Sequence, residues 1–281
     1  MTDSESIYEI TECICSWYDL LGYGKPLMDA NWNLKDKRCE SQLKRIKSLD
    51  LTHVNKFSSI HRTTSFTLND GIVLNFDINS KVKYFKNQLV MVLDDLLMEY
   101  EGLNYNDVGN GYPGVRGIIT YGHRYDYMYA ESTVSVADSF TSSFHPRVFQ
   151  MNTAFSKAYL MESSGSRAGI SGNFLYIDKY LIDKIEHLIL EQNEEDLKFR
   201  VEKNLNNADE DYYFTIFRNN EIFLTLEFDK KIVEYNQSGI DTKLFKYLRR
   251  ISLQDQLANE SAFREGQRYL QMEIDEFKEN E

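Results

Sequence analysis

The sequence predicts an α+β fold in which a core of order β-α-β-β-α-β is followed by a C-terminal helix–hairpin–helix extension. An alternating apolar run over 8–18 indicates a strand, and an Asp-Gly pair at 70–71 between two apolar runs indicates a tight hairpin. A wide apolar stripe over 81–101 indicates a long helix with one buried face. This order of elements is that of the ferredoxin-like split pattern, in which helices cover a sheet.

The first elements of the core follow from strand and turn signals. The strand over 8–18 is rich in Ile, Cys, Trp and Tyr and stops before a glycine-containing loop. A helix is expected next over 34–49, because its leucines and isoleucine fall on one side. Strands over 58–68 and 72–78 then flank Asn69-Asp70-Gly71, and an Asp-Gly turn between apolar runs is the strongest short-range hairpin signal.

The remaining core elements alternate between helix and strand. The long helix over 81–101 ends before a segment rich in glycine and proline, and a strand over 115–121 follows. A helix over 146–162 and a strand over 174–177 complete the pattern. We therefore expect one domain over 1–180.

The composition changes after about residue 179, where a charged helix leads into a loop rich in Asn and Asp. Two apolar runs over 212–217 and 222–228 indicate a second hairpin, and a long helix is expected over 241–277. We expect residues 181–281 to form an α/β extension that packs on the main domain or serves as a dimerisation arm.

Overall composition excludes several classes of protein. With 281 residues, 42% of them hydrophobic, the chain can bury a full core. A formal net charge of −12 disfavours a broad cationic surface, so no nucleic-acid partner is expected. The acidic first residues lack the pattern of a signal peptide, and no apolar stretch is long enough to span a bilayer, so we expect a cytoplasmic protein without a membrane partner. The three cysteines do not have disulfide-framework spacing, and we expect Cys13 and Cys15 to be packing residues.

Two carboxylates carry the functional prediction. Asp19 ends the first strand, and Asp70 sits at the tip of the hairpin. In a β-α-β-β arrangement these positions are neighbours at one edge, where two carboxylates can share divalent ions that bridge a triphosphate. Magnesium suits such a site, because substrate phosphates complete its coordination. Taken singly, each residue also fits a plain structural role, Asp19 in a strand-to-loop turn and Asp70 in the hairpin scaffold.

Three segments resemble a known family. Trp17-Tyr18-Asp19-Leu20-Leu21-Gly22-Tyr23 resembles the aromatic-x-Asp-x-x-Gly-aromatic segment of class III nucleotidyl cyclases, Asn69-Asp70-Gly71-Ile72-Val73 resembles their Asp-Gly hairpin, and 115–122 resembles their next core strand, in family order. Segments 152–163 and 174–178 look most like the pyrimidine (cytidylate or uridylate) cyclases of bacterial Pycsar anti-phage systems. The resemblance covers roughly residues 8 to 180.

The resemblance implies conversion of a nucleoside triphosphate, UTP or CTP, to its 3′,5′-cyclic monophosphate and pyrophosphate. It implies that Asp19, Asp70 and the Leu20 carbonyl hold two Mg²⁺ or Mn²⁺ ions, and that backbone N–H groups of Leu21, Gly22 and Tyr23 hold phosphates. It also implies a homodimer with the site between subunits, and a second messenger in anti-phage signalling that acts on a separate cyclic-nucleotide-responsive effector.

The chain departs from the family on the helix after the arginine strand. Adenylyl and guanylyl cyclases place an Asn and, four residues later, an Arg there, and the alignment gives Ser156 and Leu160. Lys157 is the nearest cation and could act as a point charge, although the pattern fits a solvated lysine on the helix surface equally well. Arg116 could contact substrate or pair with a structural carboxylate. Lys157, Ser156 and Arg116 are thus the candidate catalytic residues.

Two other functions stay open from the sequence. A catalytically silent cyclase-like module that dimerises or binds a nucleotide is favoured by Ser156 and Leu160, whereas the retained Asp19 and Asp70 favour the enzyme. A palm-type nucleotidyltransferase would use the same two carboxylates but needs a path for a second substrate.

Overall fold

The computed structural model describes residues 9–54, 63–125, 147–191, 197–207 and 209–253. The chain divides into two compact units, each discontinuous in sequence. Of the described residues, those up to 188 and 231–247 belong to the first unit, and those in 189–230 and 248–253 belong to the second. The division expected at residue 180 stays a prediction.

The first unit contains a sheet and the helices that cover it. Its elements are β1 (Ile10–Leu20), α1 (Gly24–Asp29), the 3-10 helix η1 (Lys37–Cys39), α2 (Glu40–Val54), β2 (Thr63–Leu68), β3 (Gly71–Asp77), α3 (Phe85–Gly109), β4 (Val115–Tyr125), the 3-10 helix η2 (Arg147–Phe149), α4 (Thr153–Ser164), the 3-10 helix η3 (Gly165–Ala168), β5 (Leu175–Asp178), α5 (Lys179–Glu191), β9 (Val233–Gln237) and β10 (Ile240–Ser252). Of these, α5 and β10 continue past the boundary of the unit.

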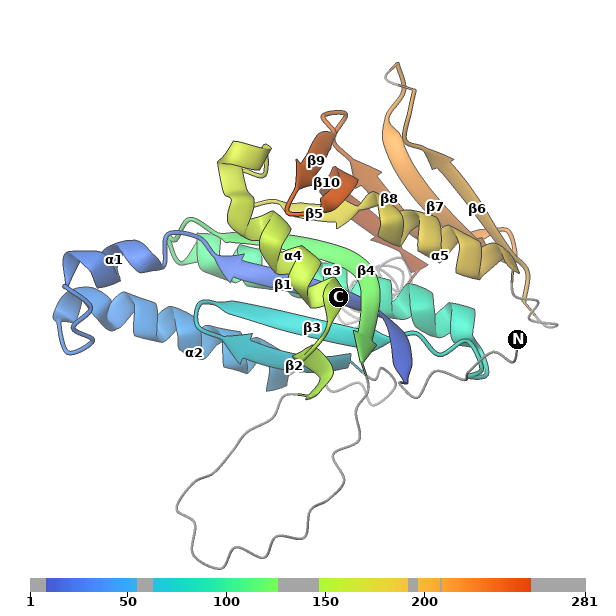
Figure 1. The fold of residues 1–281 in the computed structure, drawn as a ribbon. Coiled ribbons are helices and arrows are strands. Elements are labelled where there is room, and N and C mark those ends of the chain that lie inside the picture. The colour runs from blue at the N-terminus through green and yellow to red at the C-terminus, as the bar shows by residue number, and fades with distance from the viewer. Residues whose placement is uncertain (1–8, 55–62, 126–146, 192–196, 208, 254–281) are drawn as a thin grey trace, which may run out of the picture. The chain divides into compact units, whose positions relative to one another are not determined.

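The sheet of the first unit has the strand order β2-β3-β1-β4-β5-β10, with β9 paired to β10 (Figure 1). The central strand β1 runs antiparallel to both β3 and β4, while β4 and β5 are parallel. The predicted α+β class and the β-α-β-β-α-β order of the core are confirmed, and the described part of the first connection holds α1, η1 and α2.

Helices α3 and α4 cover opposite faces of this sheet (Figure 1). Trp17 packs against Phe155 of α4 with ring centroids 5.9 Å apart, whereas Tyr18 donates a 2.6 Å hydrogen bond to the Leu96 carbonyl of α3. Successive side chains of a strand point to opposite faces. Asp19 therefore lies on the α4 face, two positions beyond Trp17.

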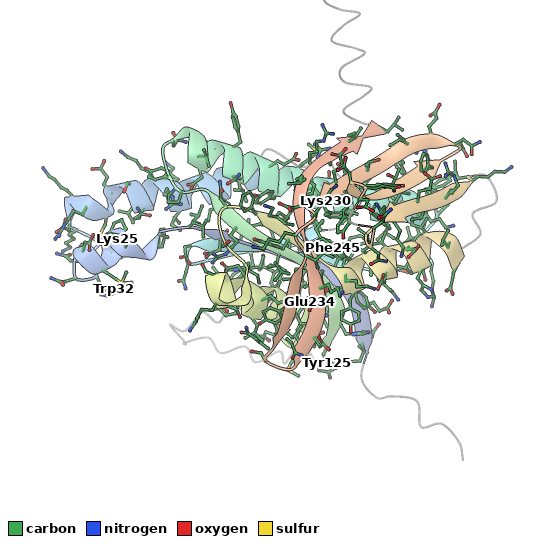
Figure 2. All side chains as sticks on the ribbon, turned by 90° about the horizontal axis from the view of Figure 1, so that it is seen from above. Lys25, Trp32, Tyr125, Lys230, Glu234 and Phe245 are labelled. Carbon is green, nitrogen blue, oxygen red and sulfur yellow. The ribbon has the colours of Figure 1, made fainter. Side chains whose placement is uncertain are left out.

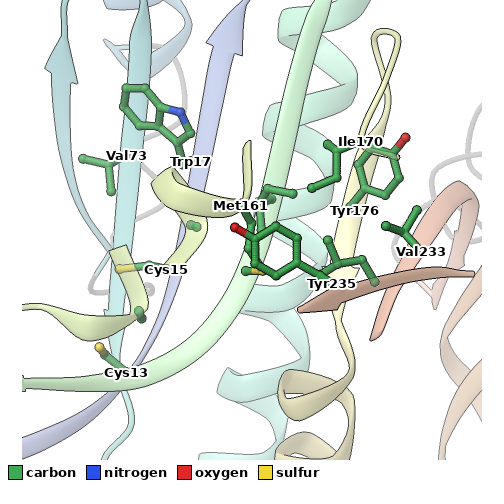
Figure 3. Close-up of a cluster of buried hydrophobic side chains, with 13 residues drawn as sticks. Cys13, Cys15, Trp17, Val73, Met161, Ile170, Tyr176, Val233 and Tyr235 are labelled. Carbon is green, nitrogen blue, oxygen red and sulfur yellow. The ribbon is translucent and has the colours of Figure 1, made fainter. Parts of the chain in front are cut away.

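The core on the α4 face is closed by small and aromatic residues (Figure 3). Cys13 and Cys15 are fully buried free thiols beneath α4, and both contact the side-chain oxygen of Asn152. Asn152 also accepts a 2.9 Å bond from the Phe155 N–H, which caps the start of α4. These positions agree with the expectation that the two cysteines are packing residues.

The site end of the sheet is marked by α1, which follows β1. Figure 2 shows Lys25 of α1 beside the exposed Trp32, away from Tyr125 at the last position of β4. Tyr125 pairs with Ile10, the first residue of β1, so it lies at the end of β1 that is remote from Asp19 and α1. Within the described residues, no helix is both long and apolar enough to cross a bilayer.

The second unit contains an antiparallel sheet of β6 (Phe199–Asn204), β7 (Tyr212–Arg218) and β8 (Glu221–Phe228). The hairpin predicted here is confirmed. Its turn residues Asn219 and Asn220 have φ angles of 52° and 69°, as a tight hairpin with twisted strands requires.

The predicted C-terminal helix is wrong over residues 241–252, which form most of β10. The apolar residues at 244, 245, 247 and 248 fit a helical period, but Ser238-Gly239 turns the chain with φ angles of 54° and 73° and pairs β10 with β9. The rest of that predicted helix, 254–277, lies outside the described residues, as do 58–62 of the predicted strand and Pro146 at the start of the predicted helix.

Candidate functional site

The structure brings Asp19 and Asp70 to the same end of the sheet. In the pairing of β1 with β3, Asp19 is directly opposite Gly71, and the Leu20 N–H donates a 2.9 Å hydrogen bond to the Asp70 carbonyl. Both side chains are half-buried. The juxtaposition expected from the strand order is therefore present within one chain.

Burial and neighbouring charges both act on the carboxyl groups at this end of the sheet. Burial first, and then the charges of Glu162 and Asp70, raise the pKa of Asp19 to about 8, against opposing effects of Arg116 and Arg45. Burial also raises the pKa of Asp70. A cation bound between the carboxylates would offset this repulsion.

The Arg116 side chain forms an ion pair with a buried carboxylate. It stands opposite Asp19 in the pairing of β1 with β4, and its Nε donates to Glu162 Oε1 of α4 at 2.7 Å while Nη2 donates to the same oxygen. The two side chains are only 15% and 6% exposed. Of the two roles considered for Arg116, the structure shows the pairing with a structural carboxylate.

Glu162 is a residue that the sequence interpretation missed. Its charge acts on Asp19, and it holds Arg116. The signal was available in the spacing of α4, because Ala154 and Ala158 form a buried stripe that reaches Glu162 four residues later. A glutamate on the buried face of a helix requires a partner, and an arginine is the expected one.

One of the three backbone N–H groups expected to hold phosphates is hydrogen-bonded within the protein itself. The Leu21 N–H donates a 3.0 Å bond to the Gly114 carbonyl, so it is engaged within the fold. Gly22 has a φ of 70°, and a Cβ there would lie 3.2 Å from Pro113 Cγ. Of the three N–H groups predicted to bind phosphate, those of Gly22 and Tyr23 remain candidates, and that of Leu21 does not.

The Leu20 carbonyl points toward the edge that carries Asp70. A trans peptide places the carbonyl of one residue opposite the N–H of the next. Because the Leu21 N–H points to Gly114 beside β4, the Leu20 carbonyl points away from β4, toward the β3 side. The Leu20 carbonyl therefore lies on the same side of β1 as the Asp70 backbone.

The candidate residues on α4 lie in a different environment. Ser156 is exposed and its hydroxyl donates a 2.9 Å bond to the Asn152 carbonyl, one turn back. Lys157 is half-buried with Nζ 6.0 Å from the centre of the Tyr180 ring, and burial lowers its pKa against the opposing charge of Asp178. The charges that act on Lys157 are thus not those that act on Asp19, and Lys157 interacts instead with Asp178 and Tyr180.

The donor set fits a divalent cation that a substrate would complete. Asp19, Asp70 and the Leu20 carbonyl offer only oxygen, which Mg²⁺ and Mn²⁺ prefer. Among the described residues there is no group of three or more His, Cys, Asp or Glu side chains placed to hold a metal. A site with two carboxylates leaves coordination positions for phosphate oxygens.

Comparisons with known proteins give likenesses to solved structures alone. No family model matches the sequence, and no curated protein matches it. The guanylyl cyclase Cya2 matches with a TM-score of 0.40 and 11% identity over 85% of this chain and 93% of its own. The adenylyl cyclase CyaB from P. aeruginosa matches with 0.42 and 10% over 86% and 96%. The guanylate cyclase domain of RhGC from Catenaria anguillulae, in complex with GTP, matches with 0.38 and 9% over 86% and 100%.

Proposed function

We propose that this chain is a nucleotide cyclase that converts a nucleoside triphosphate to its 3′,5′-cyclic monophosphate and pyrophosphate. The observation that supports it most is the meeting of Asp19 and Asp70 at one end of the sheet, with the Leu20 carbonyl directed to the same edge. In the reaction the ribose O3′ forms a bond to the α-phosphorus, the bond from that phosphorus to the bridging oxygen of pyrophosphate breaks, and the 3′-hydroxyl proton passes to water.

Each residue of the site has a defined task in this reaction. Asp19, Asp70 and the Leu20 carbonyl would hold two Mg²⁺ or Mn²⁺ ions, which supply a lowered pKa at the 3′-hydroxyl and neutralisation of the leaving pyrophosphate. The N–H groups of Gly22 and Tyr23 would orient the triphosphate. The pairing of β1 with β3 places the backbone of Asp19 opposite Gly71, next to Asp70, so little backbone reorganisation is needed when substrate binds.

The proposal includes a homodimer. The two cations whose charges act on Asp19, Arg116 and Arg45, are both paired with buried carboxylates. A second subunit would supply the free cation that the triphosphate needs, and Lys157 with its depressed pKa is the candidate, with Ser156 beside it. A cation from α4 of one protomer would then face Asp19 of its partner.

We further propose UTP or CTP as the substrate, and a role of the cyclic product as a second messenger that acts on a separate effector in anti-phage signalling. The support for this part is the resemblance of segments 152–163 and 174–178 to pyrimidine cyclases. A direct comparison of turnover with the four ribonucleoside triphosphates decides the choice of base.

A catalytically silent nucleotide-binding module is the second candidate. It is favoured by the pairing of Arg116 with Glu162, and by Leu160 at the position where the family resemblance expects an arginine. Such a module would bind a triphosphate with a divalent ion without turnover.

The test is incubation of the protein with each ribonucleoside triphosphate and Mn²⁺ or Mg²⁺, with chromatography of the products. A cyclic mononucleotide with pyrophosphate supports the enzyme, and a dinucleotide supports a palm-type nucleotidyltransferase. Nucleotide binding without turnover supports the silent module. Asp19→Asn and Asp70→Asn should each abolish turnover while the dimer persists, and the exposed Asp241→Asn should not. Activity close to wild type in either site variant would refute the assignment.

A further inference from the structure

We propose that Arg45, through its ion pair with Asp107, is a positioning residue that orients the peptide between Leu20 and Leu21 for cation binding. The inference rests on the proposed function, because the orientation of that peptide matters only if the Leu20 carbonyl and Asp19 bind a cation.

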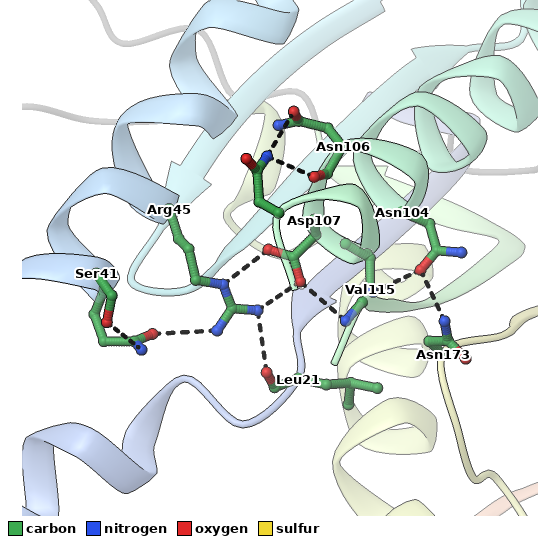
Figure 4. Close-up of polar contacts among 11 residues, drawn as sticks. Leu21, Ser41, Arg45, Asn104, Asn106, Asp107, Val115 and Asn173 are labelled. Atoms are coloured by element: carbon green, nitrogen blue, oxygen red, sulfur yellow. Dashed lines mark hydrogen bonds and ion pairs between the residues drawn. The ribbon is translucent and has the colours of Figure 1, made fainter. Parts of the chain in front are cut away.

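Arg45 is held on every side by a buried polar network (Figure 4). Its Nε and Nη2 donate to the two oxygens of Asp107, each at 2.8 Å, and the two side chains are only 2% and 4% exposed. Its Nη1 donates to Gln42 Oε1 at 3.1 Å, and its guanidinium lies 4.7 Å from the centre of the Tyr112 ring. The pair joins α2 to the end of α3.

The same network continues into the end of β1. Arg45 Nη2 donates a second bond, of 3.1 Å, to the Leu21 carbonyl. Asp107 Oδ2 accepts from the Gly114 N–H at 2.9 Å, and the Gly114 carbonyl accepts from the Leu21 N–H at 3.0 Å. Both backbone polar groups of Leu21 are therefore fixed by a ring of contacts that passes through Arg45 and Asp107.

This ring determines where the Leu20 carbonyl points. The Leu20 carbonyl and the Leu21 N–H belong to one planar peptide, so a fixed N–H fixes the carbonyl on the opposite side. That side is the one of Asp70, whose carbonyl accepts from the Leu20 N–H. Loss of the ring would leave Asp19 in the sheet but free the next peptide to rotate.

The contacts need a guanidinium. Three of its nitrogens bind three different partners at once, Asp107, Gln42 and Leu21. A lysine would keep the charge but offers one compact ammonium group, which cannot reproduce the planar fork. Arg45→Lys therefore separates the positioning of Leu21 from the charge that acts on Asp19.

The matched control is Arg124→Lys. Arg124 makes a similar fork to Asp77, with bonds of 2.7 and 2.6 Å, and its side chain is 7% exposed. It lies opposite Thr11, at the other end of β1 from Asp19. Both variants lose a bidentate ion pair, but Arg45→Lys also loses the hydrogen bond to the Leu21 carbonyl.

The first measurement is amide hydrogen exchange of the metal-free protein. In Arg45→Lys we expect the Leu21 amide to exchange about tenfold faster relative to the core amide of Ile118, and in Arg124→Lys we expect that ratio to be unchanged. The second is Mn²⁺ binding followed by electron paramagnetic resonance, where Arg45→Lys should weaken affinity about tenfold, a usual effect of losing a partner that orients a ligand. If Arg45→Lys does not fold, Asp107→Asn takes its place with the same expectations.

Equal behaviour of Arg45→Lys and Arg124→Lys in both measurements would overturn the inference. Its failure is distinguishable from failure of the proposed function. If the wild-type protein forms no cyclic nucleotide but the two variants differ as expected, the cyclase proposal falls and the positioning role stands. If the wild-type protein forms a cyclic nucleotide and the two variants do not differ, the positioning role falls and the cyclase proposal stands.

Discussion

Arg116 and Asp19 stand opposite one another in the pairing of β4 with β1, yet Arg116 donates its side-chain hydrogen bonds to Glu162 of α4. The arginine is thereby tied to the helix that covers this face. The consequence is an acidic site, in which the pKa of Asp19 is raised by burial and by the charges of Glu162 and Asp70. The predictions below follow from this arrangement and from the close packing around it.

Replacement of Glu162 by glutamine should have two opposite effects. Arg116 keeps a hydrogen-bond acceptor but loses a charge partner, so the free energy of unfolding should fall by about 1–3 kcal/mol. The pKa of Asp19 should fall, because one of the charges that raise it is removed, and Mn²⁺ should bind more tightly at neutral pH. Denaturant unfolding and Mn²⁺ titration measure the two effects. Weaker Mn²⁺ binding in this variant would instead make Glu162 a contributor to cation binding.

Stability of the metal-free protein should depend on the Asp19 carboxyl. Its pKa is about 8 in the folded chain against an ordinary value of 3.8, so between these values the folded state holds a proton that the unfolded state releases. This contribution to stability is fully present at low pH and is lost as pH rises toward 8. Unfolding in the presence of a chelator should show it, and Asp19→Asn should flatten the profile. A wild-type profile that matches that of Asp19→Asn would contradict the assignment.

A divalent cation should reverse that pH dependence. Protons compete with the cation for Asp19, so affinity should increase as pH rises through 7 to about 8. Added Mn²⁺ should therefore stabilise the protein more at pH 8 than at pH 6, measured as the shift in melting temperature. An equal shift at both values would show that the cation does not contact this carboxylate.

Gly71→Ala should disturb the hairpin that carries Asp70. A Cβ at this position would overlap the Trp17 indole and lie 2.8 Å from the Tyr18 carbonyl oxygen, which cannot move without breaking β1. We expect a loss of roughly 1–3 kcal/mol in the free energy of unfolding, together with reduced turnover. The control is Gly102→Ala in α3, where nothing lies within 4 Å of the added methyl and stability should increase by up to about 1 kcal/mol.

Lys157→Met should reduce turnover without weakening Mn²⁺ binding. The ammonium is half-buried and its pKa is lowered, so its removal should cost little stability. If Lys157 of one protomer acts on the substrate held by its partner, kcat should fall by at least about tenfold, which corresponds to one lost charge interaction. Lys157→Arg should retain more activity, and an unchanged kcat in Lys157→Met would identify Lys157 as a structural lysine.

The meeting of the two carboxylates was predictable because it depends on strand order. Asp19 ends a strand and Asp70 lies in a two-residue turn, and both features have strong local signals. Pairing of β1 with β3 then places them together without any information about side-chain packing. The core helices and strands were predictable for the same reason, although α4 begins at Thr153, after the Asn152 cap, and not at Pro146.

The contacts made by side chains of distant helices were not predictable in this way. Arg45 and Asp107 are separated by 62 positions, and their pairing depends on the rotation of α2 against the end of α3. No spacing rule reports that rotation. The error over β10 has another cause, since the apolar residues at 244, 245, 247 and 248 fit a helical period as well as a strand, and only the turn at Ser238-Gly239 separates the two.

The return of residues 231–247 to the first sheet has a consequence for biosynthesis. Strand β5 has its outer edge covered through the pairing of Leu244 with Asp178 and Phe245 with Ile177. A nascent chain that has emerged only as far as Asp178 would expose that edge to other polypeptides, because open edges recruit further strands. The ribosome must deliver the chain through residue 246, including all of 189–230, before the sheet can close, so a fragment ending near residue 180 should need chaperones or aggregate.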